Sequence, residues 1–290
     1  MRRLIFIFLL FYGPFLSAQV RLGGRVLNRN DRKPLPFANV FLSNTTKGTQ
    51  TDESGRFELQ NLANGTYDLV VSYVGYETLT LKIKPDTLQA SLTVLLEPKA
   101  NELQEITIKR LRNGYEKYFP LFKENFMGRT AFSESCKLKN PKVLWFTDDE
   151  EAGIVNVNAD DILVIENKAL GYVIKYQLEG FVYNFRKNYV TTLGYPLFEE
   201  MTTRSERQRR RWAENRKKAY LGSMEHFLRS TYLGRTTEEG FTVQKLIRRK
   251  RKETAGADTD TTLRKMGTPA FSNYVQYLVK TPLQPTQITQ

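Results

Sequence analysis

The chain of 290 residues has one histidine, His226, and one cysteine, Cys136. A single cysteine cannot form a disulfide within the chain. One histidine and one cysteine cannot supply the ligands of the usual zinc sites. Nothing around Cys136 resembles a catalytic cysteine setting, so we expect it to be a small apolar residue at a strand edge. We expect His226 to be a structural residue of a helical segment, and we expect no metal and no cofactor.

Long apolar runs are scarce as well. Residues 4–12 form an apolar run that follows Arg2 and Arg3, and residues 16–18 offer a small-residue end. This order is typical of a secretory signal peptide, and the run is shorter than the roughly 20 residues that a membrane-spanning helix needs. We therefore expect residues 1–18 to be a cleaved signal peptide and the mature chain to have no membrane-spanning segment.

Positive charge, by contrast, is abundant: 44 Lys and Arg face 31 Asp and Glu, for a net charge of +13. Such a balance favours polyanionic partners. The densest cluster on an expected helix comprises Arg207, Arg209, Arg210 and Arg211. Guanidinium groups bind phosphate or carboxylate in bidentate fashion, so this cluster is a candidate docking site for an anionic outer-membrane surface or an acidic partner. A solvated helix face is the alternative, and both stay open.

Residues 19–97 alternate between short apolar runs and turn residues. We expect strands at residues 20–27, 38–42, 56–60, 67–74, 79–83 and 92–96. Runs of this length and spacing are typical of a small antiparallel β-sandwich.

Four residues of this region are expected to have structural roles in turns. Asp52 suits a turn in which its carboxylate accepts hydrogen bonds from nearby amides, and Gly55 suits a positive φ. Gly65 follows an asparagine in a tight-turn signal between two apolar runs. Gly75 indicates a bulge or a tight bend. Too few oxygen ligands surround Asp52 for a calcium loop.

Specific segments of this region resemble a known family. Residues 36–40, 48–49, 51–52, 55–57 and 72–76 resemble the carboxypeptidase-regulatory-like domain, a transthyretin-like (Ig-like) sandwich. It is a non-catalytic module of metallocarboxypeptidases and also stands at the N-terminus of many TonB-dependent receptors of Gram-negative bacteria. The resemblance implies the fold and no peptidase activity, because the catalytic domain of those peptidases binds zinc through histidines.

Residues 98–110 are interpreted as a linker or joining strand. Within it, residues 103–109 are similar to the segment that follows this module in TonB-dependent receptors. About 180 residues remain, fewer than the plug and barrel of such a receptor require. We therefore expect a different C-terminal domain.

Residues 111–290 are predicted to form an α+β domain. Aromatic residues at three- and four-residue steps predict a helix from Tyr115 to Phe126, bent or begun near Pro120. Strands are expected at residues 142–146, 154–157, 162–165, 172–178 and 181–185, a hairpin tip at 148–151, a turn at 194–198, one long helix at 204–232, and a mobile loop or frayed end at 248–262. Residues 166–183 and 219–230 resemble a domain that follows this module in a family of uncharacterised exported bacterial proteins. That domain often runs longer, so whether it is complete here stays open.

The sequence thus indicates a non-enzymatic exported protein of the periplasm or outer-membrane periphery of a Gram-negative bacterium. Its partner is expected to be an envelope protein or a glycan. A carboxylate-dependent glycan-active enzyme is an alternative, although no pair of acids stands in a recognisable catalytic setting. Binding of anions or nucleic acid is a second alternative, and export argues against nucleic acid.

Overall fold

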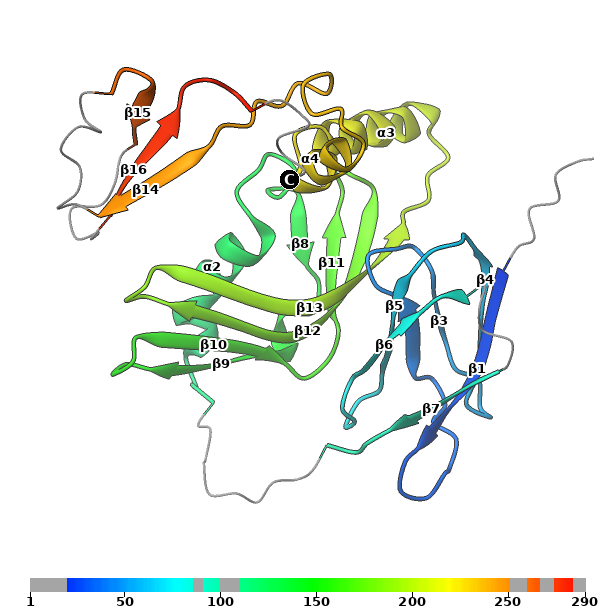
Figure 1. Cartoon of the computed structure of the whole chain (residues 1–290). Coiled ribbons are helices and arrows are strands. Elements are labelled where there is room, and N and C mark those ends of the chain that lie inside the picture. Colours follow the sequence, from blue (N-terminus) through cyan, green and yellow to red (C-terminus); the bar gives the residue numbers. More distant parts are fainter. Residues whose placement is uncertain (1–19, 86–90, 100–109, 251–259, 267–273, 284–290) are drawn as a thin grey trace, which may run out of the picture. The chain divides into compact units, whose positions relative to one another are not determined.

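The computed structural model describes residues 20–85, 91–99, 110–250, 260–266 and 274–283. The chain divides into two compact units, residues 1–204 and 205–290. The first unit holds two N-terminal sheets and a six-stranded sheet with one helix, and the second holds two helices and a small sheet (Figure 1). The predicted signal peptide lies outside the described residues.

Seven strands form the N-terminal sheets. They are β1 (Val20–Asn28), β2 (Asn39–Leu42), β3 (Gly48–Gln50), β4 (Arg56–Leu62), β5 (Tyr67–Ser72), β6 (Leu79–Ile83) and β7 (Leu92–Leu96). One sheet has the order β4-β1-β7 and the other the order β3-β2-β5-β6. Their inner faces share one core, so the predicted sandwich is confirmed.

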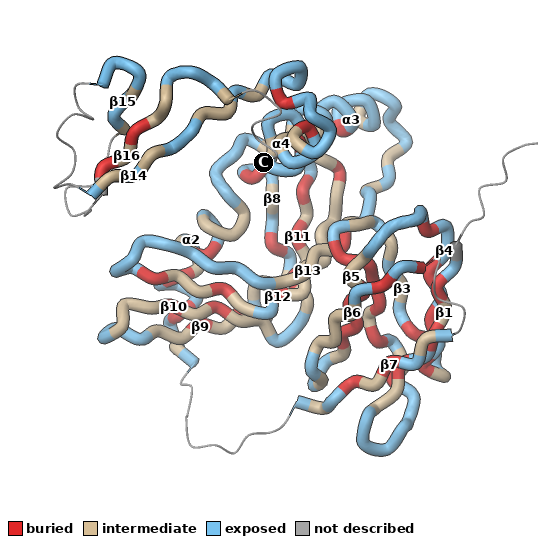
Figure 2. Tube along the Cα trace, in the orientation of Figure 1, coloured by how far each residue is buried: buried red, intermediate tan, exposed pale blue. Residues whose placement is uncertain are grey.

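The core follows from alternation along each strand. In β4, Phe57 and Leu59 are buried, whereas Arg56 and Glu58 between and beside them are exposed. Figure 2 shows buried segments on the strands of both sheets. Removing such a side chain from water stabilises the fold by about 1.5–3 kcal/mol. The buried set is Leu22, Val26, Leu35, Ala38, Val40, Leu42, Phe57, Leu59, Leu62, Leu69, Val71, Ile83, Val94 and Leu96.

The sandwich differs from the sequence prediction in one strand pairing and in one connection. The predicted antiparallel arrangement is wrong for β1 and β7, which pair in parallel from Gly24–Leu92 to Asn28–Leu96. Strands β4 and β5 belong to different sheets. Gly65 therefore lies in a connection that crosses between the sheets and does not close a hairpin. Alternation within a strand carries no information on strand direction or on which sheet the strand joins.

The six-stranded sheet follows helix α2 (Gly114–Met127). Its strands are β8 (Cys136–Leu138), β9 (Leu144–Asp149), β10 (Ile154–Ala159), β11 (Leu163–Asn167), β12 (Tyr172–Asn184) and β13 (Tyr189–Glu200), with a 3-10 turn at Pro141–Val143. The order is β8-β11-β12-β10-β9, and β13 pairs with β12. The two strands expected within residues 172–185 are one strand, β12, whose register shifts between Leu178 and Gly180.

Helix α2 covers the sheet with its aromatic side chains. Phe122 is fully buried, 5.1 Å from the Phe181 ring and 4.8 Å from the Phe126 ring, measured between ring centroids. Pro120 lies inside the helix, which begins six residues before it. The spacing of the aromatic residues therefore predicts the helix correctly, but not a start at Pro120.

Residues 194–198, predicted as a turn, are part of strand β13. Gly194 is required because a Cβ there would lie 2.4 Å from both Tyr176 Cε1 and Gln177 O. Pro196 is tolerated because β13 is an edge strand, where a missing N–H can face away from the partner strand. Gly194 and Pro196 are therefore explained by close packing and by the edge position of β13, and they do not mark a turn. The hairpin tip between β9 and β10 spans residues 150–153, and Asp148 belongs to β9.

Within the first unit, the sandwich contacts strand β13. Phe41 of β2 and Val70 of β5 point away from the sandwich core and are buried with Leu197. The backbone amide of Asn44 donates a hydrogen bond of 2.8 Å to the Pro196 carbonyl. The Phe198 amide donates one of 2.9 Å to the Thr45 carbonyl. The outer face of one sandwich sheet is therefore an internal interface.

The second unit contains α3 (Glu206–Tyr220), α4 (Met224–Tyr232), β14 (Leu246–Lys250), β15 (Leu263–Lys265) and β16 (Tyr274–Val279). The prediction of one helix over residues 204–232 is wrong. Gly222 has a φ of +81°, and the Ser223 hydroxyl caps α4 by accepting a hydrogen bond from the His226 amide. The prediction of a loop or frayed end at residues 248–262 is wrong for 248–250, which lie in β14, and residues 251–259 lie outside the described residues.

Among the described residues, no helix combines the length and the apolar character needed to cross a membrane.

Candidate functional site

The predicted turn residues lie beside a concave surface on the sandwich. Asp52 Oδ1 accepts hydrogen bonds from the amides of Ser54 and Arg56, at 2.9 and 2.8 Å, and from the Ser54 hydroxyl. These bonds, that of the Arg56 amide first, hold the pKa of Asp52 below its ordinary value. Gly55 has a φ of +73°. The turn sets the start of β4 and the position of Arg56.

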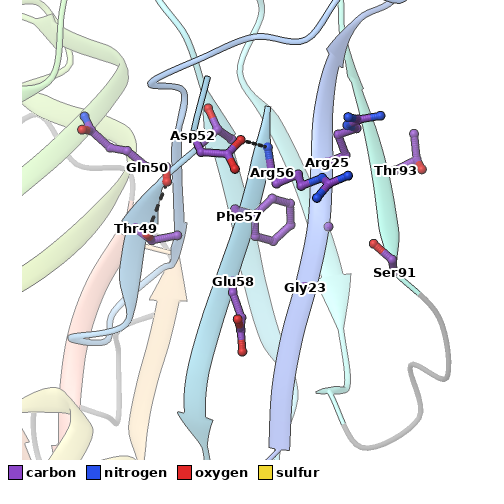
Figure 3. A pocket seen from close by; sticks show the side chains of 12 residues that line it. Gly23, Arg25, Thr49, Gln50, Asp52, Arg56, Phe57, Glu58, Ser91 and Thr93 are labelled. Carbon is purple, nitrogen blue, oxygen red and sulfur yellow. Dashed lines mark hydrogen bonds between the residues drawn. The ribbon is translucent and has the colours of Figure 1, made fainter. Parts of the chain in front are cut away.

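The concave surface, with a volume of about 830 Å³, lies over β1, β4, β7 and the segment from β3 to the Asp52 turn (Figure 3). Arg25 of β1 and Arg56 of β4 are direct partners across the antiparallel ladder. Thr93 of β7 is the partner of Arg25 on the other side. The lining side chains are mostly polar and include Thr49, Gln50, Ser91 and Thr93.

The charged side chains on this surface differ in how many hydrogen-bond partners they have. Arg25 donates from Nε to the Ser54 carbonyl at 3.0 Å. Its Nη groups and the whole guanidinium of Arg56 have no hydrogen-bond partner among the described residues. The acid Glu58 is engaged by Arg21, at 3.6 Å, and by Gln60. Most of the unused hydrogen-bonding capacity of the charged side chains is therefore cationic, and one carboxylate oxygen each of Asp52 and Glu58 makes up the remainder.

Two glycines shape the middle of this surface. A Cβ on Gly23 would meet only the Phe57 carbonyl, at 3.8 Å, so the outer side of Gly23 is open. A Cβ on Gly24 would lie 2.4 Å from the Leu92 carbonyl and 2.6 Å from the Phe57 ring. Gly24 is thus needed for packing, whereas Gly23 leaves space beside the two arginines.

The arginine cluster predicted as a docking site lies on α3. Arg209 and Arg210 form ion pairs with Glu206 one turn earlier, the latter at 3.4 Å. Arg207 and Arg211 are exposed and have no hydrogen bond or ion pair with any described residue. Of the four arginines, only Arg207 and Arg211 therefore have a guanidinium group without an ion-pair partner among the described residues.

His226 and Cys136, the one histidine and the one cysteine of the sequence, each have contacts typical of a structural residue. His226 is buried, with its ring between those of Tyr220 and Phe241. Its Nδ1 accepts a hydrogen bond from the Gly222 amide at 3.1 Å, and its Nε2 lies 3.2 Å from Glu239 Oε2. Cys136 begins the edge strand β8, and burial raises the pKa of its thiol.

The sequence prediction did not include Arg25, Arg56, Ser91 and Thr93. Alternation with buried Val26 and Phe57 could have placed both arginines on an outer face. Their pairing depends on the β1–β4 register, which local pattern does not specify. Gly75 also lies outside the concave surface, with a φ of +82° in a turn closed by the Tyr76 amide and the Tyr73 carbonyl.

Comparisons with known proteins agree with this architecture of the N-terminal module. Residues 22–108 match a family model described as CarboxypepD_reg-like domain. The chain is 28% identical over 109 residues to TonB-dependent receptor P3 and 33% identical over 109 residues to TonB-dependent receptor P39, both of Formosa agariphila. The matches cover 37% and 36% of this chain and 10% of each receptor. The chain thus spans about a tenth of the length of the receptors it matches.

Among solved structures, a chain of a type II cohesin–X-dockerin complex from Acetivibrio cellulolyticus aligns over 27% of this chain and 58% of its own length. The sequence identity is 24% and the TM-score is 0.22, too low to establish a shared overall structure. The sequence matches establish the N-terminal module: residues 22–108 are a CarboxypepD_reg-like domain, similar in sequence to part of bacterial TonB-dependent receptors.

Proposed function

We propose that this chain is a non-enzymatic binding protein of the bacterial envelope, whose CarboxypepD_reg-like domain binds an acidic glycan at the concave surface. The observation that carries this proposal is the direct pairing of Arg25 and Arg56 beside the open outer side of Gly23. The similarity to TonB-dependent receptors supports the envelope as the location.

The physical argument starts from the like charges. Two cations directly opposite each other on adjacent strands destabilise a sheet. A carboxylate or sulfate between Arg25 and Arg56 removes this repulsion and accepts charge-assisted hydrogen bonds from both. The hydroxyls of Ser91 and Thr93 and the amide of Gln50 suit the hydroxyl groups of a sugar chain. The open, polar form of the surface fits a chain better than the mostly apolar pockets of small-molecule sites do.

The state of the acids supports a binding role without catalysis. A glycosidase needs two carboxyl groups facing the substrate. On this surface Asp52 is held by three donors and Glu58 by Arg21 and Gln60. The lowered pKa of Asp52 disfavours the protonated form that a general acid needs, which supports binding over catalysis.

The experiment is a calorimetric titration of the full chain with an oligogalacturonide, an oligomer of uronic acid. A neutral maltooligosaccharide of the same length is the comparison ligand. We expect binding of the acidic ligand alone, weakening with salt because exposed charges are screened within about 10 Å at 0.1 M. Arg56→Gln and Gly23→Val, which fills the open space, should each reduce affinity about tenfold or more. Arg29→Gln, an exposed arginine paired with Glu97, is the matched control.

Equal affinity for the two oligosaccharides, or unchanged affinity in both variants, contradicts the proposed site. An assay for new reducing ends in the same mixtures tests the non-enzymatic role, and their appearance would support the enzyme alternative. The envelope location is tested by N-terminal mass spectrometry of native protein. A mature N-terminus at Gln19 is expected, and a cytoplasmic product that retains Met1 contradicts it.

A further inference from the structure

Helix α4 exposes most of its large apolar residues, and only Phe227 is partly buried, against the Phe241 ring. Its fully buried residues are polar, His226 and Ser230. Large apolar residues are exposed instead: Met224 at 71%, Leu228 at 58% and Tyr232 at 88% of their surface. A helix on the surface of a globular protein normally directs its apolar stripe inward.

The exposed apolar residues form one continuous stripe. Leu221, half exposed, lies in the extended connection before the helix, and within the helix Met224, Leu228 and Tyr232 follow one another at steps of four residues. Such steps place side chains above one another on the same face. At 1.5 Å per residue the stripe from Met224 to Tyr232 is about 12 Å long. Leu233, 52% exposed, widens its end.

Contacts of the buried His226 side chain fix the orientation of α4. The Ser223 hydroxyl accepts from the His226 amide, and His226 Nδ1 accepts from the Gly222 amide. At its other ring nitrogen, His226 contacts Glu239. The first two bonds are local to the start of the helix, whereas the contacts with Glu239 and with the Phe241 ring lie outside it. Rotating α4 to bury the stripe would break these two outside contacts and expose the His226 ring. The apolar face is therefore held outward by the same contacts that hold the polar face inward.

Positive charge directly precedes the stripe. Helix α3, of sequence ERQRRRWAENRKKAY, has seven basic residues and two acidic ones. Lys217 and Lys218 stand in its last turn, just before Leu221, and Arg207 and Arg211 have no ion pair with a described residue. An apolar helix face accompanied by a basic segment is the combination that binds the interface of anionic membranes. Tyr232 at the end of the stripe suits the headgroup level, which favours aromatic rings with a polar tip.

We propose that the stripe of Met224, Leu228 and Tyr232 inserts into the interface of a lipid bilayer that contains anionic lipids, with α3 supplying electrostatic attraction. This is a peripheral contact. It uses a surface distinct from the concave surface of the sandwich.

The test measures co-sedimentation of the full chain with vesicles of phosphatidylcholine alone and of an equimolar mixture of phosphatidylcholine and phosphatidylglycerol. We expect binding to the mixed vesicles. The triple variant Met224→Gln, Leu228→Gln, Tyr232→Ser should reduce the partition coefficient about tenfold or more. All three residues are exposed, so an unchanged melting temperature and unchanged oligogalacturonide binding should accompany the loss. Val74→Gln, an equally exposed apolar residue of the sandwich, is the control.

Two results overturn the proposal. One is wild-type protein that does not sediment with mixed vesicles at low salt. The other is a triple variant that binds them as tightly as wild type. If the wild type instead shows concentration-dependent self-association that the triple variant lacks, the stripe is a protein interface and the membrane proposal is wrong. Arg207→Gln with Arg211→Gln should lower binding to the anionic vesicles and reduce its dependence on salt.

Discussion

The Tyr118 hydroxyl donates a hydrogen bond of 2.6 Å to Oδ2 of Asp148, joining helix α2 to strand β9. Lys117 Nζ lies 3.1 Å from the same oxygen. The Tyr118 hydrogen bond first, and Lys117 second, hold the pKa of Asp148 below its ordinary value. Burial first, and then Asp148, raises the pKa of Tyr118. An acid expected at a solvated hairpin tip therefore fastens the helix to the sheet.

This contact predicts an acid-dependent loss of stability. Because the pKa of Asp148 is lower in the folded state than in the unfolded chain, where it is about 3.9, its contribution is fully present above that value. It is lost as pH falls through the folded pKa. We expect Asp148→Asn to lower the melting temperature at pH 7 and to flatten its decline below about pH 4. Glu53→Gln, an exposed acid, is the control, and an identical decline in wild type and Asp148→Asn contradicts this role.

Two buried hydroxyls of the sandwich should respond differently to removal. Thr51 Oγ1 donates to the Leu35 carbonyl at 2.6 Å and accepts from the Ala38 amide at 2.8 Å. Ser72 Oγ is buried with no partner among the described residues. Thr51→Val should cost about 1–3 kcal/mol of unfolding free energy because it leaves two backbone groups unpaired, whereas Ser72→Ala should be nearly neutral. Urea denaturation measures both, and equal losses would refute the difference.

The internal interface predicts a strong contrast along strand β13. Leu197 is 8% exposed against Phe41 and Val70, whereas Leu193 on the same strand is 58% exposed. Leu197→Ala should cost about 2 kcal/mol or more, since it leaves a cavity in a packed contact. Leu193→Ala should change the unfolding free energy by less than about 0.5 kcal/mol. Similar values for the two variants would mean that the contact contributes little.

The same interface bears on the isolated sandwich. A fragment of residues 20–97 keeps all seven strands but exposes Phe41 and Val70, which are 2% and 0% exposed in the whole chain. We expect the fragment to fold with dispersed amide resonances and to self-associate through this apolar patch. Phe41→Thr should restore a monomer in sedimentation velocity. A collapsed spectrum would show that the sandwich requires the six-stranded sheet.

The break between α3 and α4 depends on one glycine. Gly222 has a φ of +81° and no atom within 4 Å of a Cβ built on it. Gly222→Ala should therefore cost about 1–2 kcal/mol through the backbone alone. Gly180→Ala, equally open but without a positive φ, is the control. A thermal melt in which both variants match wild type contradicts this explanation.

Local pattern predicted most elements but not their partners. Alternation in β4 and β6 and the aromatic spacing of α2 depend on neighbouring residues, so the sequence predicts them directly. The three-residue strand β3 is too short to produce a pattern. Gly194 and Gly222 illustrate the limit: the first is required by a close approach within a strand, and the second ends a helix. Only the tertiary structure distinguishes these causes.

The candidate site is harder to predict for the same reason. Asp52 and Gly55 act within four residues of each other, so their turn is visible in the sequence. Arg25 and Arg56, which are distant along the chain, come together through strand pairing. The exposed apolar stripe of α4 becomes apparent only once the buried side is known, because the sequence alone shows an ordinary amphipathic pattern.

The parallel pairing of β1 and β7 has a mechanical consequence. The chain enters the sandwich through β1 and leaves it through β7, and the two strands run in the same direction over five residue pairs. A pulling force applied between residues before β1 and residues after β7 slides these strands along each other. The ladder hydrogen bonds then bear the load together, whereas a hairpin pulled at its two ends opens one bond at a time. The sandwich is therefore built to resist tension applied along the chain at its two ends.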